Sequence, residues 1–145
     1  LRSAIFSSGR PVMMCPDQAA PPTIGNRIAI GWNGSIEASR AMRMSMPLIR
    51  KADSVNILTT ENQEGHRAGA NELQRLFRMH GVESEIVLIE NKGVIGERLL
   101  EASETKEADL LVMGAYHDGY ARQELFGGNA QNVVDNAQIP VIMAH

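Results

Sequence analysis

The chain has 145 residues, of which 43% are hydrophobic and 21% charged, and its formal net charge is −3. This length suits one domain with a single core. The slightly negative net charge gives no excess of basic residues for binding nucleic acid or an anionic membrane. Cys15 is the sole cysteine, which excludes an internal disulfide and favours a reducing, cytoplasmic location. No apolar run approaches the roughly 20 residues of a bilayer span, and no signal-peptide pattern opens the chain.

The first 15 residues resemble the last ones when the two are offset by 129 positions. Ala4 and Ile5 then fall on Val133 and Val134, and a proline followed by a strand-like run matches in the same way: Pro11, Val12, Met13 and Met14 against Pro140, Val141, Ile142 and Met143. Both ends predict a short helix, a turn, a proline and a strand. A chance match of two helix–turn–strand units is the alternative, but we interpret residues 1–15 as the last helix and strand of a preceding copy of the domain.

Residues 16–26 are rich in Pro and Ala and lack periodicity, which predicts an interdomain linker. Residues 27–145 then alternate short apolar runs with segments of helical period, the pattern of a parallel sheet covered by helices. The predicted strands are 27–32, 55–59, 85–89, 110–114 and 141–143. The predicted helices cover 38–49, 95–102, 130–137 and a segment that begins near 70 and closes at His80-Gly81. We therefore predict an α/β domain.

Small and sulfur-containing side chains are expected in its core. Cys15 stands at the end of a predicted strand, so we expect it to be a small core residue rather than a reactive thiol. The same role is expected of five methionines, Met42, Met46, Met79, Met113 and Met143.

Two loops follow the carboxyl ends of predicted strands, where open α/β sheets bind ligands. The first contains Asn33 and Gly34 and leads into a helix, with Gly34 or Ser35 as the expected N-cap. The second runs from Gly114 to a Gly-Gly pair that opens the last helix. Such a pair suits a phosphate cradle, and it equally suits a tight turn that needs positive φ. Residue chemistry alone leaves both interpretations open.

Three segments together resemble the universal stress protein family. The run from Ile28 to Ser35 is similar to the family's first strand and turn. The run from Ala108 to Gly114 is similar to the family's approach to its glycine loop, and the run from Pro140 to Met143 is similar to its closing strand. Gly114 and Gly127 hold the first and last glycines of the family's loop pattern at the correct separation. The resemblance covers residues 27–145 and extends to residues 1–15 as the end of a second such domain.

The resemblance implies a doubly wound, five-stranded parallel sheet of order 3-2-1-4-5, similar to the adenine nucleotide alpha hydrolase fold. It also implies a nucleotide site, with ATP as the possible ligand and no cofactor required. The residues that match its motifs are Asn33, Met113, Gly114, His117, Gly127, Gly128 and Asn129. Three of them depart from the family pattern: Asn33 stands where an Asp belongs, His117 where the middle glycine belongs and Gly128 where a hydroxyl residue belongs.

Function is expected to lie in regulatory binding and self-association. The last strand would be a sheet edge, and family members commonly associate through it, so we predict that Val12–Met14 pairs antiparallel with Val141–Met143, within the chain or across a dimer. His117 beside Asp118 lacks a nucleophile fixed next to it, and the other histidines lack the spacing of a zinc site. We therefore predict no enzyme activity and no metal. An ATP-binding module and a weak ATP hydrolase are the alternatives to a regulatory module without ligand.

Overall fold

The computed structural model describes residues 1–17, 21–60, 64–115 and 128–145. The strands are β1 Val12–Met14, β2 Arg27–Gly31, β3 Ser54–Thr60, β4 Glu85–Ile89, β5 Leu110–Gly114 and β6 Val141–Ala144. The helices are α1 Arg2–Ser7, α2 Ile36–Ile49, α3 Glu64–Met79, α4 Ile95–Thr105 and α5 Gly128–Asn136. The α/β class expected from the sequence is confirmed.

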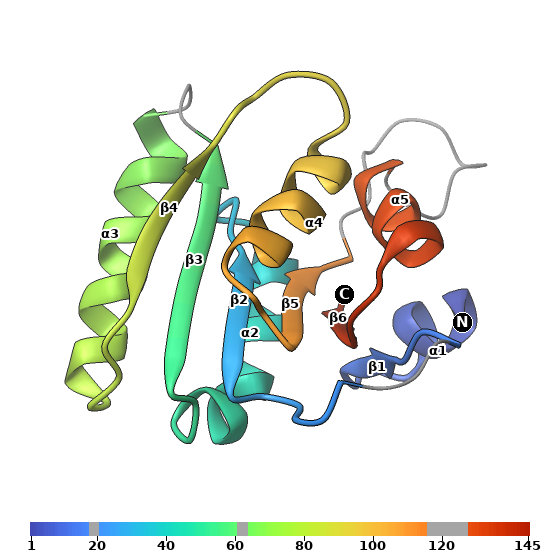
Figure 1. The fold of residues 1–145 in the computed structure, drawn as a ribbon, viewed down its shortest axis with the longest axis horizontal. Coiled ribbons are helices and arrows are strands. Elements are labelled where there is room, and N and C mark those ends of the chain that lie inside the picture. Colours follow the sequence, from blue (N-terminus) through green and yellow to red (C-terminus); the bar gives the residue numbers. More distant parts are fainter. Residues whose placement is uncertain (18–20, 61–63, 116–127) are drawn as a thin grey trace.

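All six strands form one sheet, in the order β1-β6-β5-β2-β3-β4 (Figure 1). The strands β2 to β6 run parallel, and when they are counted from β2 their order is the expected 3-2-1-4-5. The expectation of a five-stranded parallel sheet is wrong, because β1 adds a sixth, antiparallel strand beside β6. The expectation that the last strand is an edge is wrong for the same reason: β1 is the edge and β6 is internal.

Helices cover both faces of the sheet (Figure 1). Ile28 and Ile30 of β2 belong to a core cluster with buried residues of α2 and α3, whereas Ala29 belongs to a cluster with residues of α1, α4 and α5. Successive residues of a strand point to opposite faces, so a strand covered on both sides is apolar at most of its positions. This explains the continuous apolar runs of the sequence.

The pairing of β1 with β6 repeats the 129-residue offset of the sequence. Helices α1 and α5 end at Ser7 and Asn136, and the strands that follow begin at Val12 and Val141. Met13 lies opposite Ile142, its own equivalent under that offset, and the flanking pairs are Val12 with Met143 and Met14 with Val141. This is the register that a two-fold axis through the Met13–Ile142 pair produces. Of the two arrangements expected, pairing within one chain is the one present.

Two of the residues expected in the core are not there. Cys15 is exposed, because it follows the last residue of a three-residue edge strand. Met79 is 79% exposed, since it lies on the side of α3 opposite the buried Leu73 and Phe77. The other expected core methionines hold their place: Met42, Met113 and Met143 are buried and Met46 is half-buried.

A buried carboxylate fixes the end of the expected linker. Asp109, directly before β5, accepts hydrogen bonds from the Thr23 hydroxyl at 2.8 Å and from the amides of Gly25, Asn26 and Arg27 at 2.9, 3.1 and 3.0 Å. A buried charge is costly unless it is satisfied in this way. Residues 23–26 are thereby held against the start of the sheet's central strands.

Candidate functional site

Strand order reverses between β2 and β5, and the loops after both strands begin there. Gly31 lies opposite Met113 at the carboxyl ends of these strands. From β2 the chain winds outward to β3 and β4, and after crossing over it winds from β5 to β6 in the other direction. Such a switch point is where open α/β sheets bind ligands. The fold therefore brings the Asn33 loop and Gly114 to one edge of the sheet, whereas His117 and Gly127 lie outside the described residues.

The loop between β2 and α2 is held by its own side chains. Ser35, the N-cap of α2, accepts a hydrogen bond from the Ala38 amide at 3.1 Å through its Oγ. Asn33 Oδ1 accepts one from the Ser35 amide at 3.1 Å, and Gly34 between them has a φ of +73°. This is the turn chemistry that Asn and Gly favour. The side-chain oxygen of Asn33 is thus engaged in shaping the loop.

Gly114 is where α2 packs against the end of β5. A Cβ placed on Gly114 would lie 2.5 Å from the Ala38 amide nitrogen and 2.8 Å from the Glu37 carbonyl carbon. Both are backbone atoms of the first turn of α2, so a side chain cannot be accommodated without moving the helix. Gly114 therefore has a packing role that needs no ligand. The side chain of the neighbouring Met113 lies in the core and is 6% exposed.

The first turns of α4 and α5 meet beside this edge. Asn129 Oδ1, at the start of α5, accepts a hydrogen bond from the Gly96 amide of α4 at 3.3 Å. The N-cap residue of α4 itself, Val94, makes no side-chain cap. A Cβ on Gly96 would lie 2.6 Å from the Asn129 carbonyl oxygen. Gly96 thus permits the close approach of the two helices, a role that sequence reasoning missed. By contrast, a Cβ on Gly128 would meet nothing within 4 Å.

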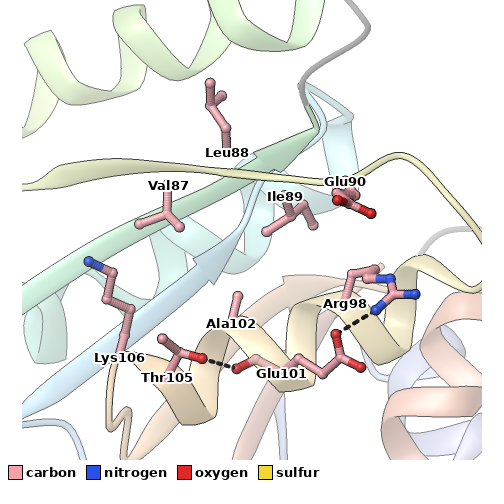
Figure 2. A pocket seen from close by; sticks show the side chains of 9 residues that line it. All are labelled: Val87, Leu88, Ile89, Glu90, Arg98, Glu101, Ala102, Thr105 and Lys106. Carbon is pink, nitrogen blue, oxygen red and sulfur yellow. Dashed lines mark hydrogen bonds and ion pairs between the residues drawn. The ribbon is translucent and has the colours of Figure 1, made fainter.

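A groove lies between β4 and α4, and β4 is the edge strand opposite to β1 in the sheet (Figure 2). It has a volume of about 380 Å³, and its lining is apolar in the middle and charged at its ends: Val87, Leu88, Ile89, Glu90, Arg98, Glu101, Ala102, Thr105 and Lys106. Arg98 donates to Glu101 at 2.7 Å, a bond that raises the pKa of the Arg98 guanidinium above its ordinary value. Lys106 pairs with Glu85 at 3.1 Å. Both cations of this groove are therefore already neutralised.

The part of the chain that the structure describes offers no site for a metal ion and no helix that could span a membrane. It contains no group of three or more His, Cys, Asp or Glu side chains arranged to hold a metal ion. None of its helices has both the length and the apolar character required to cross a membrane.

The strand order is the one that the resemblance to universal stress proteins implies. The model of the Universal stress protein family matches residues 43–145. The chain belongs to the universal stress protein family. No curated protein matches it.

Solved structures share the fold at low sequence identity. A universal stress protein from Archaeoglobus fulgidus DSM 4304 aligns with a TM-score of 0.76 and 17% identity over 92% of this chain and 50% of its own, so this chain spans about half its length. The universal stress protein from A. fulgidus in complex with dAMP aligns with a TM-score of 0.62 and 19% identity. The alignment covers 85% of this chain and all of that protein. A universal stress protein in complex with cAMP aligns with a TM-score of 0.64 and 20% identity. The alignment covers 83% of this chain and 97% of that protein.

Proposed function

We propose that the chain is a non-catalytic regulatory domain of the stress response, located in the cytoplasm, that acts by pairing with a homologous domain along β6. The observation that carries this proposal is the register of β1 on β6, in which Met13 lies opposite its own equivalent, Ile142. An isologous contact between two copies of the α5–β6 unit has this self-complementary form. The α1–β1 unit occupies the place that such a second copy would take.

The same register supports a tandem arrangement, in which residues 1–15 end a preceding domain and residues 16–26 are the linker. Residues 27–145 make up 119 of the 145 residues, about 82%, whereas the alignment with the longer A. fulgidus protein covers 92% of the chain. That alignment therefore includes at least about 14 of the 26 residues before position 27, and the A. fulgidus protein is about twice as long as this chain. An alignment that begins before position 27, in a protein long enough for two such domains, supports the tandem arrangement.

Charges placed on the two faces of β1 test the pairing. Val12 and Met14 are half-buried and pack against the core, whereas the Met13 side chain points outward. V12D/M14D should release β1 and leave β6 as a bare edge, and the chain should then self-associate into a dimer of twice its 15.8 kDa mass. Met13→Asp is the matched control and should stay monomeric, like the parent.

The measurement is light scattering coupled to size-exclusion chromatography, with circular dichroism to establish that each variant is folded. The pairing proposal predicts a change of mass for V12D/M14D alone. A folded V12D/M14D variant that stays monomeric would contradict it, and so would a parent chain that is already dimeric.

Nucleotide binding at the switch point is the second candidate function. It is supported by the two aligned universal stress proteins in complex with dAMP and cAMP, and by the N-termini of α4 and α5 at this edge, whose amides favour anions. Asn33, Gly114 and Asn129 all have packing or capping roles, so their presence does not itself require a nucleotide. Equilibrium dialysis with ATP, dAMP and cAMP decides the question, and no binding at millimolar concentration would eliminate this candidate.

A weak ATP hydrolase is the least supported alternative. The one hydroxyl in the loop after β2, that of Ser35, accepts from the Ala38 amide as the cap of α2 and has no general base bonded to it in the described part of the chain. A hydrolase requires an activated nucleophile or water. Phosphate release assayed with millimolar ATP should stay at the rate of buffer alone, and saturable turnover would overturn the non-catalytic proposal.

A further inference from the structure

The outward face of α2 combines basic and apolar side chains without any acidic one. Its exposed residues recur at intervals of three and four and so form one stripe along the helix: Ile36, Arg40, Arg43, Met44, Pro47 and Arg50. The residues that α2 buries lie on the opposite side: Ala38, Ala41, Met42, Ser45 and Ile49. Glu37, the one acidic residue of α2, is half-buried in the first turn and lies off this stripe.

The cations of this stripe have no Asp or Glu partner in the described part of the chain. Arg40 donates to the His145 carbonyl oxygen at 3.1 Å, and Arg50 lies 3.0 Å from the Nδ1 atom of His80. The ion pairs among the described residues lie elsewhere, on Arg27, Arg75, Arg98 and Lys106.

Charge is therefore unevenly distributed over the molecule. Residues 36–51 carry four cations and one anion, a formal charge of +3, whereas the whole chain carries −3. The remainder must then carry −6, the difference between the two. A positive stripe on a negative molecule attracts a negative partner to one face and repels it from the others.

The stripe also exposes more apolar surface than a solvated face requires. Ile36 is 67% exposed and Met44 43%, and they stand two helical turns apart among the arginines. Interfaces combine apolar anchors with arginine in this way.

We propose that the outward face of α2 binds a short acidic segment of a partner protein, in which carboxylates meet the arginines and apolar side chains cover Ile36 and Met44. A short segment fits better than a nucleic acid or an anionic bilayer, because a long polyanion would extend beyond α2 onto a surface of charge −6. This inference does not rest on the pairing of β6 or on nucleotide binding.

The test uses fluorescence anisotropy with the full chain and a labelled 14-residue helical peptide that presents four Glu and two Leu on one face. We expect saturable binding that weakens at least tenfold in R40E/R43E and severalfold in I36A/M44A. R75E/R78E on α3 changes the net charge equally and should bind like the parent. If R40E/R43E does not fold by circular dichroism, R40Q/R43Q replaces it.

Three results would overturn the proposal. The first is no binding of the peptide at millimolar concentration. The second is equal loss of binding in R75E/R78E, which would indicate an effect of net charge alone. The third is binding of a 20-nucleotide single-stranded DNA or of phosphatidylserine vesicles in preference to the peptide.

Discussion

Replacing Gly114 by alanine would place a methyl group 2.5 Å from the Ala38 amide nitrogen. Real Cβ contacts do not come this close, and the obstructing atoms are backbone in the first turn of α2, so the helix must shift by about 1 Å from the end of β5. Overpacking of this kind costs about 1–3 kcal/mol. For a chain of this size we expect the melting temperature to fall by roughly 3–10 °C.

The matched control is Gly128→Ala. A Cβ at Gly128 meets nothing within 4 Å, and Gly128 is the first residue of α5. Alanine there should leave stability unchanged or raise it by up to about 1 kcal/mol. Urea unfolding monitored by circular dichroism, with an unchanged denaturant slope, gives both free energies. If Gly114→Ala melts within 1 °C of the parent, the packing role argued for Gly114 is wrong.

Asp109→Asn should destabilise the chain by about 2–4 kcal/mol, because a neutral amide has one acceptor oxygen and cannot replace a carboxylate that accepts four hydrogen bonds. Urea unfolding measures the loss, and Asp135→Asn, at an exposed position, is the control that should have no effect. Asn129→Ala should cost about 1 kcal/mol by removing the hydrogen bond to the Gly96 amide, and Asn129→Asp should retain it; a melt in which both variants match the parent would contradict this cap. Pro47 lies inside α2 and lacks an N–H, so Pro47→Ala should raise the urea midpoint by the equivalent of about 1–2 kcal/mol; an unchanged midpoint would mean that the helix already adapts to the proline.

The strands and their order were predictable because their signals are local or belong to the family. The run from Arg27 to Trp32 is apolar without alternation, which is typical of a strand covered on both faces. The sixth strand was predictable only in part: the 129-residue offset identified Val12–Met14 as a strand able to pair with Val141–Met143, but the choice between one chain and two depends on the path of residues 15–26.

The contacts that shape the site were not predictable, because they join residues far apart in the chain. The donors to Asp109 come from residues more than 80 positions earlier, and no local pattern of Asp109 indicates them. Gly96 and Gly114 are both short of space, yet only Gly114 belongs to a recognisable motif. Cys15 and Met79 were assigned to the core by residue type, and their exposure follows from the short edge strand and from the helical phase of α3.

Gly128 offers the cleanest test of whether the switch point can still bind a nucleotide. Gly114 must be glycine for packing, so its presence says little about phosphate. Gly128 has open space around it, and the family pattern places a hydroxyl residue there. Gly128→Ser should therefore leave the melting temperature unchanged and, if the remaining site is intact, add one hydrogen bond to a phosphate, worth about 1.5–3 kcal/mol or roughly a tenfold or greater gain in ATP affinity. Dialysis that finds no gain would mean that the departures at Asn33 and His117 have already removed the site.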